Sequence, residues 1–333
     1  MAVSRKALAR GREALAGEIL QKIDSGDRIG MVIKKDSSTG ARSFSGSIPF
    51  WHLNTLALPV ADAVDPAAEP RHVVELERMR LKISRRRAPM PYTYRSTTRD
   101  EVHFVHAGRA RFLTELGEIE GVPGRFVFIG RGGSYRVVPE GDSFFDLILE
   151  SEEAVTASEH WTTCQLSVIQ PRFPFDPDAG HGPWIERIRG DEWSATVERD
   201  YDPVASMEVV GAHDLVFAID MKDIPAVVPG THRPFRLFTH PLLDWDISKQ
   251  GAGEGPPFHH RNNVRNEIHF VHHGDADQVT ELGYIKAPPG TLFCMPFGIE
   301  HTFGQRETPP ATLLMETQGK VRLIEPEHFL ASK

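Results

Sequence analysis

Two stretches, EVHFVHAG at residues 101–108 and EIHFVHHG at residues 267–274, decide the fold because one is a copy of the other. The copies are offset by 267 − 101 = 166 residues, and at that offset the match continues without a gap. TELG at 114–117 aligns with TELG at 280–283, and LES at 149–151 aligns with MET at 315–317. A repeat of this kind indicates a duplicated domain.

Each copy contains short runs of β-branched and aromatic residues separated by Gly, Pro and Asp turns, as in HFVH, RFVFIG and TLLMET. This spacing is typical of an antiparallel β-sandwich or barrel, so the predicted fold class is mainly β, with two tandem domains. The expected boundaries are an N-terminal domain at 1–155, a linker or insertion rich in Pro, Gly and Asp at 156–210, and a C-terminal domain at 211–333.

Helices are expected in only two places. In the N-terminal segment, apolar residues recur at helical spacing up to Ser25-Gly26-Asp27, which predicts a short helix that ends there. These residues are Ala7, Leu8, Leu15, Ile19 and Ile23. A second short helical piece is expected around 73–80.

Composition narrows the class of partner. The net charge of −8 over 333 residues argues against nucleic-acid binding, which needs clustered Lys and Arg, and favours a small-molecule partner. Only Cys164 and Cys294 are present, which is too few for a disulfide framework and fits a reducing cytoplasm. No secretory signal pattern or membrane-spanning apolar run of about 18 residues is found, so we expect a cytoplasmic protein with no membrane partner.

Positions shared by both copies are candidates for scaffold. The glycine pairs Gly108/Gly274, Gly117/Gly283 and Gly124/Gly290 fit tight turns that need a positive φ angle. The histidine pairs His103/His269 and His106/His272 are also shared, and a structural role is the first expectation for them.

Positions found in only one copy are candidates for chemistry. His259, His260, Asn262, Asn263 and His301 align with Thr93, Tyr94, Ser96, Thr97 and Tyr135, so each lacks a nitrogen counterpart in the first copy. Only Glu267 keeps its equivalent, Glu101. We therefore expect the first copy to lack metal ligands and the second to be the working domain.

Glu267 and His301 are expected on different strands of one barrel, with a His or Asn from HHRNN beside them. Two imidazoles and a carboxylate that leave coordination positions open suit Fe(II). Zinc is an alternative, although no HExxH helix is present. A histidine cluster without a metal is another.

The duplicated β-domain, with HHRNNVRNE followed by PPGTLFCMPFGIEHTF, resembles a pair of cupin domains, which are double-stranded β-helices or jelly rolls. HRN followed by Glu is similar to the iron site of homogentisate dioxygenase. The length and two-copy plan look more like the large subunit of the two-component hydroquinone dioxygenases. That resemblance implies an Fe(II) enzyme that uses O2 to open hydroquinone to 4-hydroxymuconic semialdehyde, together with a smaller subunit in a hetero-oligomer.

The spacing departs from both patterns. Asn262 stands where the general cupin pattern has its second His, and the homogentisate spacing would place Arg261 at the metal, where a guanidinium cannot ligate. His260 or Asn263 could therefore be the third ligand, and both stay open. Manganese in place of iron also stays open.

The resemblance implies a base that takes the phenolic proton, and His259 and His269 are the candidates. His259 could instead orient a ligand by a hydrogen bond. Phe258, Phe270, Phe293, Phe297 and Phe303 are possible walls for the ring.

Two other functions stay open. A homogentisate or gentisate dioxygenase would bind a substrate carboxylate, with which Arg261 or Arg265 could pair. A non-enzymatic metal- or ligand-binding bicupin would need no open iron site.

Overall fold

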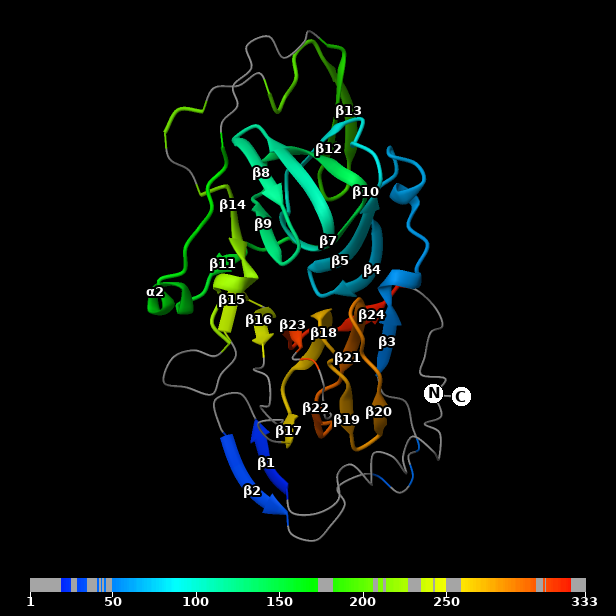
Figure 1. The fold of residues 1–333 in the computed structure, drawn as a ribbon, viewed down its shortest axis with the longest axis vertical. Coiled ribbons are helices and arrows are strands. Elements are labelled where there is room, and N and C mark those ends of the chain that lie inside the picture. The colour runs from blue at the N-terminus through cyan, green and yellow to red at the C-terminus, as the bar shows by residue number, and fades with distance from the viewer. Residues whose placement is uncertain are drawn as a thin grey trace. The chain divides into compact units, whose positions relative to one another are not determined.

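The structure is a computed structural model that describes residues 19–24, 29–34, 41, 43, 45, 50–172, 182–205, 209–211, 214–226, 235–241, 243–249, 259–303, 308 and 310–324. Contacts between Cα atoms divide the chain into two compact units. We call residues 59–156 and 165–224 the first unit, and residues 1–58, 157–164 and 225–333 the second unit. Both are built almost entirely from antiparallel strands (Figure 1).

The first unit is organised around two long curved strands, β7 and β10, which pair with each other over most of their length (Figure 1). β10 also pairs with β5 and β6, whereas β7 pairs with β8 and β9. The strands of this unit are β4 (Arg71–Leu76), β5 (Met79–Arg86), β6 (Thr93–Ser96), β7 (Asp100–Thr114), β8 (Gly117–Gly121), β9 (Arg125–Ile129), β10 (Ser134–Ser151), β12 (Trp184–Arg189), β13 (Ser194–Arg199) and β14 (Val216–Asp220), with short 3-10 helices η2 (Ala61–Ala63) and η3 (Met221–Asp223).

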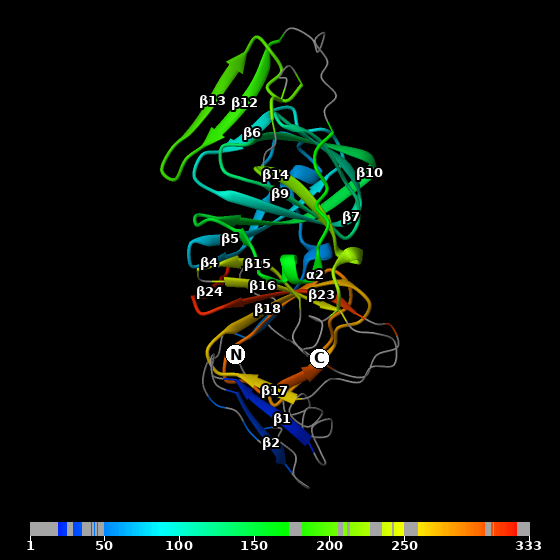
Figure 2. The same cartoon turned by 90° about the vertical axis from the view of Figure 1, so that its left-hand side faces the viewer.

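The second unit has two sheets. One has the order β2-β1-β17-β22-β19-β20, and the other runs β15-β16-β23-β18-β21-β3. Figure 2 shows β17 beside the β1–β2 hairpin, in keeping with the parallel pairing of β1 with β17. The elements are β1 (Ile19–Asp24), β2 (Ile29–Lys34), β3 (Trp51–Asn54), η1 (Thr55–Ala57), α2 (His160–Cys164), β15 (Phe235–His240), β16 (Leu243–Lys249), β17 (His259–Asn262), β18 (Asn266–His273), β19 (Gln278–Thr280), β20 (Gly283–Ile285), β21 (Thr291–Met295), β22 (His301–Phe303), β23 (Ala311–Thr317) and β24 (Val321–Leu323). A two-residue strand, β11 (Thr156–Ala157), lies where the chain passes between the units.

The sequence repeat is also a repeat of strand pairing. Glu101 of β7 lies opposite Ile129 of β9 and Glu150 of β10, and Glu267 of β18 lies opposite Met295 of β21 and Glu316 of β23. Glu267, Met295 and Glu316 each lie 166 positions after Glu101, Ile129 and Glu150, which is the offset of the sequence repeat. The predicted fold class, mainly β with two tandem domains, is confirmed.

Two of the shared glycines lie where the strands are irregular: Gly108 inside β7, where its pairing with β10 breaks register, and Gly274 in the bend after β18. Gly108 has φ +76° and Gly274 has φ +66°, a region that residues with a Cβ rarely enter. At Gly108 a Cβ would also collide with the carbonyl oxygen of Ser143. The predicted positive φ is therefore confirmed at both glycines, whereas Gly108 lies within a strand and not in the predicted tight turn.

Each unit encloses its own apolar core. The first is built from buried residues that include Phe112, Val127 and Phe144, and the second from residues that include Val271 and Phe293. These residues lie on strands of both copies of the repeat, which explains why the apolar runs of the two copies align.

Both helix predictions fail where the structure describes them. Residues 73–80 form the end of β4 and the start of β5, because Val73, Val74 and Leu76 are buried in a sheet. Ile19 and Ile23 lie on β1, which pairs with β2 and β17. Residues 1–18, which carry the rest of the predicted N-terminal helix, lie outside the described residues. At Ile19 and Ile23, strand pairing overrides a helical spacing of apolar residues.

The two units differ from the expected boundaries because each takes strands from a distant part of the chain. β3, near the N-terminus, pairs with β21 and belongs to the second unit. β14, after the expected linker, pairs with β9 of the first unit. Most of the linker's described part also joins the first unit, through the β12–β13 hairpin beside β6. Among the described residues, no helix is long and apolar enough to cross a membrane.

Candidate functional site

Glu267 and His301 meet inside the second unit. Glu267 lies on β18 and His301 opens β22, and each residue is 2% exposed. Glu267 Oε2 lies 3.1 Å from His301 Nε2. His301 Nδ1 lies 2.9 Å from the carbonyl oxygen of Ile299, which can only accept, so Nδ1 carries a proton and Nε2 faces the carboxylate.

His269 completes a buried group around the same carboxylate oxygen. Its Nε2 lies 3.4 Å from Glu267 Oε2, and its ring stacks on Phe293 with centroids 4.7 Å apart and an interplanar angle of 9°. His269 is therefore both part of the packed core and a neighbour of the Glu267–His301 pair. The sequence comparison favoured a structural role for it and also named it as a candidate base, and its position is compatible with both.

The charges of the two imidazoles diverge. Burial disfavours the charged form of both rings. At His301 the nearby Glu267 carboxylate outweighs burial and raises the pKa, whereas at His269 burial prevails and lowers the pKa. His269 is therefore a neutral imidazole at neutral pH, the state in which a ring nitrogen accepts a proton.

His260 occupies the position on β17 directly opposite His301 on β22. Directly opposed residues of an antiparallel pair lie on the same face of a sheet. The side chain of His260 lies outside the described residues, so only this register position is established.

Asn262 and Asn263 lie at the end of β17 and in the bend that follows it. Asn262 Oδ1 accepts hydrogen bonds from the backbone N–H groups of Val264 and Arg265, at 3.2 Å and 3.1 Å, and so fixes the bend after β17. Asn263 is half-buried within that bend. The change from strand to bend separates Asn263 from the His260 register position.

His259 lies beside a different carboxylate. Its Nδ1 is 3.8 Å from Oε1 of Glu300. Neighbouring residues of a strand point to opposite faces, so His259 and His260 do not share one. Of the two candidate bases, His269 lies with its Nε2 3.4 Å from Glu267 Oε2, whereas His259 lies near Glu300.

The predicted aromatic walls separate into core and surface. Phe270 and Phe293 are fully buried, Phe303 is half-buried and stands edge-on to His269, and Phe297 is 57% exposed. Phe258 lies outside the described residues.

Sequence reasoning missed a second carboxylate at the site. Glu316 of β23 lies directly opposite Glu267, and burial together with Glu267 raises its pKa to about 8. Its Oε1 and Oε2 lie 3.4 Å from Asn262 Nδ2 and 3.2 Å from Arg265 Nη1. The signal was present in the repeat, because LES and MET align Glu150 with Glu316.

The donor atoms fit a metal ion in part. Among the described residues, no group of three His, Cys, Asp or Glu side chains is arranged to hold one. Glu267 Oε2 and His301 Nε2, 3.1 Å apart, can nevertheless both reach one ion at ordinary bond lengths of about 2.0–2.2 Å. The bond from His301 Nδ1 to Ile299 also matches the way a metal-ligating His is usually held by its other nitrogen.

The first unit has a different set of residues at the equivalent positions. Glu101 is retained, but Tyr94 and Tyr135 stand where the second unit has His260 and His301. The remaining imidazole, His103, lies with Nδ1 2.7 Å from Asp146 Oδ2 and Nε2 3.5 Å from Glu101 Oε2. This cluster lines a pocket, which the sequence comparison did not anticipate.

No protein-family model matches the chain, and no curated protein matches it. Solved structures resemble it at low identity. A cupin 2 conserved barrel domain protein from Leptotrichia buccalis shares 11% identity over 78% of this chain and 98% of that one, with a TM-score of 0.45. Salicylate 1,2-dioxygenase from Pseudaminobacter salicylatoxidans shares 11% identity over 74% of each chain, with a TM-score of 0.44. Protein Ylba from E. coli shares 8% identity over 80% of this chain and 90% of its own, with a TM-score of 0.46.

Proposed function

We propose that this chain is an Fe(II)-dependent dioxygenase that cleaves the aromatic ring of hydroquinone or a substituted hydroquinone, and that its second unit holds the site. The observation that carries the proposal is the buried approach of Glu267 Oε2 to His301 Nε2, at 3.1 Å, with His260 in register opposite His301. A carboxylate with two imidazoles is a donor set that suits Fe(II) and leaves positions open for substrate and dioxygen.

Glu267, His301 and His260 would hold the metal. We prefer His260 to Asn263 because His260 shares a strand pairing with His301, whereas Asn263 lies in the bend. When bound, Fe(II) supplies a Lewis acid that lowers the pKa of a phenol and electrons for dioxygen. Ile299, through its carbonyl, keeps the His301 ring turned so that Nε2 faces Glu267.

His269 is the proposed base. Its Nε2 faces Glu267 Oε2, and its Nδ1 makes no hydrogen bond to any described residue. With the proton on Nε2, Nδ1 presents a lone pair that can take the phenolic proton. The stacked Phe293 ring holds the imidazole in this orientation.

The substrate is proposed to lack a carboxylate because Arg265 is already engaged. Its Nη1 contacts Asp244 Oδ2 and lies 3.2 Å from Glu316 Oε2. Arg261 follows His260 directly on β17, and adjacent strand residues face opposite sides. Neither arginine expected to pair with a substrate carboxylate is therefore placed to do so, which favours hydroquinone over gentisate, homogentisate or salicylate.

The reaction balances without a further reductant, because hydroquinone plus O2 contains the same atoms as 4-hydroxymuconic semialdehyde. The proposal includes a smaller partner subunit, which rests on the resemblance to the two-component enzymes. The reaction is proposed to take place in the cytoplasm, in keeping with the chain's two cysteines.

The test is anaerobic loading of the chain with Fe(II), followed by hydroquinone and air, with ultraviolet spectra and oxygen uptake recorded together. The reaction is run with and without the protein encoded next to this chain in its genome. Semialdehyde absorbance that matches the oxygen consumed supports the proposal, and dependence on the neighbour supports the partner. Turnover of gentisate, homogentisate or salicylate instead of hydroquinone would contradict the proposed substrate class. No turnover of any of these, with or without the neighbour, would favour a non-enzymatic bicupin.

A further inference from the structure

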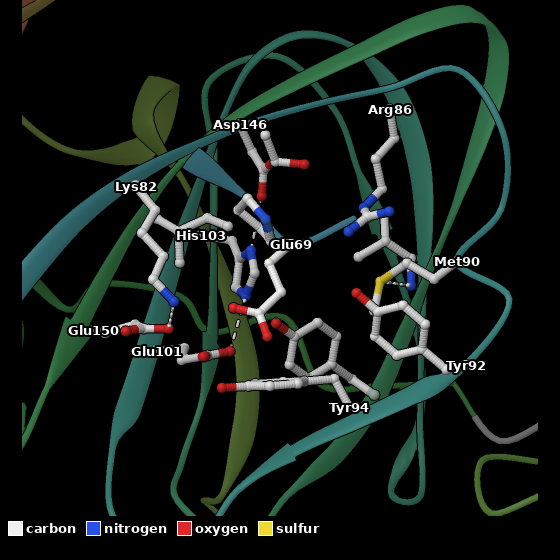
Figure 3. A pocket seen from close by; sticks show the side chains of 15 residues that line it. Glu69, Lys82, Arg86, Met90, Tyr92, Tyr94, Glu101, His103, Asp146 and Glu150 are labelled. Atoms are coloured by element: carbon white, nitrogen blue, oxygen red, sulfur yellow. Dashed lines mark hydrogen bonds and ion pairs between the residues drawn. The ribbon is translucent and has the colours of Figure 1, made fainter. Parts of the chain in front are cut away.

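The first unit contains a pocket at the place equivalent to the candidate metal site. The pocket is small and partly open to solvent, with a cavity volume of about 30 Å³. Glu101, His103, Asp146, Tyr94 and Tyr135 line it, and Figure 3 shows most of them around one space. From the sequence, this unit was expected to lack metal ligands and to serve only in packing.

Most of the charges that line the pocket cancel in pairs. Lys82 Nζ donates to Glu150 Oε1, and Arg189 Nη1, outside the lining, lies 2.7 Å from Glu69 Oε2. Arg86 Nε lies 3.7 Å from an oxygen of Asp62, outside the pocket, and Arg86 also donates to two backbone carbonyls. The two cations of the lining are thus already matched by carboxylates of the protein.

What remains is His103 between Glu101 and Asp146, seen in Figure 3 with its ring joined to both carboxylates. Burial opposes a charge on His103, but the two carboxylates outweigh it and raise its pKa to about 9. A protonated His103 then carries one positive charge between the two carboxylates of Glu101 and Asp146, which leaves one excess negative charge. A neutral His103 would leave two excess negative charges, so the excess is negative whether or not His103 is protonated.

A proton does not remove that excess. Burial works against the Glu101 carboxylate, but His103 and Lys82 outweigh it and hold the pKa of Glu101 below its usual range. Burial raises the pKa of the Tyr94 and Tyr135 phenols, so they stay neutral and add no charge.

The pocket also has an acceptor atom to spare. Asp146 Oδ1 is buried and makes no hydrogen bond to any described residue, whereas the Glu101 carboxylate interacts with His103 and Tyr135. Both residues are at least 97% buried. A buried acceptor without a donor costs free energy, which a ligand with N–H groups would recover.

From these observations we propose that the first unit binds a small organic cation, a primary alkylammonium, between Glu101, Asp146 and the Tyr94 and Tyr135 rings. An ammonium group brings one positive charge and three donors to a place with an excess negative charge and an unpaired carboxylate oxygen. Tyrosine faces attract such cations. An anion is disfavoured because Lys82 and Arg86 are already paired, and a metal ion because no group of three suitable side chains lies among the described residues.

The experiment uses the full chain at pH 7 and isothermal titration calorimetry with n-propylammonium chloride. Two isosteric probes, n-propanol and propionate, have the same chain length without the positive charge. The proposal predicts saturable binding of n-propylammonium, and dissociation constants at least about tenfold larger for n-propanol and propionate. The reason is that a positive charge about 4 Å from a carboxylate contributes several kcal/mol even at an effective dielectric constant of about 20.

Asp146→Asn and Glu101→Gln each remove one carboxylate with little change of shape, and each should weaken n-propylammonium binding at least about tenfold. Two variants are used because Asp146→Asn also weakens the hold on His103, and unfolding curves without ligand show which of them fold. The matched control is Glu118→Gln, which removes the same charge on β8, where Glu118 pairs with Arg111 at 3.4 Å outside the pocket. Binding to the control should be unchanged.

No saturable binding of n-propylammonium, equal binding of n-propanol, or unchanged binding in a folded Asp146→Asn or Glu101→Gln variant would overturn the inference. The inference does not depend on the proposed dioxygenase. His301→Ala should lose iron and keep n-propylammonium binding, so the failure of one proposal is distinguishable from the failure of the other.

Discussion

Glu267 and His301 are 34 positions apart in the sequence, yet Glu267 Oε2 lies 3.1 Å from His301 Nε2 in the interior of the second unit. Removing one partner of such a buried pair lowers the stability of the fold, because the remaining partner keeps a buried charge or polar group without compensation. We propose that the pair is maintained because it binds a metal.

His301→Ala should abolish iron retention. The substitution removes an imidazole donor and leaves Glu267 buried, so we expect less than about one tenth of the wild-type iron and a loss of stability of about 3–5 kcal/mol. Metal analysis after anaerobic loading checks the first effect, and urea unfolding checks the second. Tyr135→Phe changes the equivalent position of the first unit and should keep the iron. Full iron in a folded His301→Ala variant would remove His301 from the site.

His260→Ala and Asn263→Ala should differ. If His260 is the third ligand, as its register opposite His301 suggests, its removal lowers iron affinity at least about tenfold, whereas removal of the half-buried Asn263 amide changes it little. Iron competition with a chromogenic chelator measures both variants under one condition. If Asn263→Ala lowered iron affinity more than His260→Ala, Asn263 would be the third ligand.

Arg265→Ala should reduce stability rather than substrate affinity. The substitution removes one of the two arginines near Asp244 and Glu316 and leaves Arg236 beside Asp244, and since Arg265 is about one quarter exposed we expect a loss of about 1–3 kcal/mol. The exposed Arg322 provides the control, as Arg322→Ala should change stability by less than about 0.5 kcal/mol. If Arg265→Ala left stability intact but raised the KM of a carboxylated phenol specifically, the proposed substrate class would be wrong.

His103 should make the stability of the first unit dependent on pH. Its pKa is raised to about 9 in the folded chain, against an ordinary value of 6.5, so its stabilising effect is fully present below about pH 6.5 and is lost as pH rises through about 9. Urea unfolding of wild type and His103→Gln across this range gives the comparison. The two free energies of unfolding should converge as pH rises, and a constant difference would show that His103 does not titrate there.

Gly108→Ala and Gly132→Ala form a matched pair. Both glycines have positive φ, +76° and +88°, so alanine is strained by about 1–2 kcal/mol at either position. Only at Gly108 would the new Cβ also meet the carbonyl oxygen of Ser143, while at Gly132 nothing lies within 4 Å. Gly108→Ala should therefore be the more destabilising by at least about 1 kcal/mol in thermal or urea unfolding, and equal losses would mean that the backbone relaxes around the added methyl group.

The repeat together with its strand-like apolar runs was enough to predict two β-domains, and the residues unique to the second copy pointed to His301 as a neighbour of Glu267, which the structure places 3.1 Å from it. Segments without a copy were predicted poorly. Ile19 and Ile23 have helical spacing, but β1 is a strand because it pairs with β17, a contact between residues more than two hundred positions apart. No local pattern contains that information.

The first unit shows a second limit. The first copy lacks the histidines that could bind a metal, and for that reason alone it was expected to have no site of its own. Asp146 and Lys82 lie on β10 and β5, outside the compared motif, and the fold brings them to the pocket that Glu101 lines. Such a cluster emerges from strand pairing and not from any spacing in the sequence.

The most direct test of the dioxygenase is turnover under ¹⁸O2. The Fe(II)-loaded chain, with its genomic neighbour present, is mixed with hydroquinone under the labelled gas, and the product is analysed by mass spectrometry at early times. The account predicts a ring-opened semialdehyde that carries both atoms of one O2 molecule, and none from the His301→Ala variant. Benzoquinone without label, or the same product from His301→Ala, would contradict it.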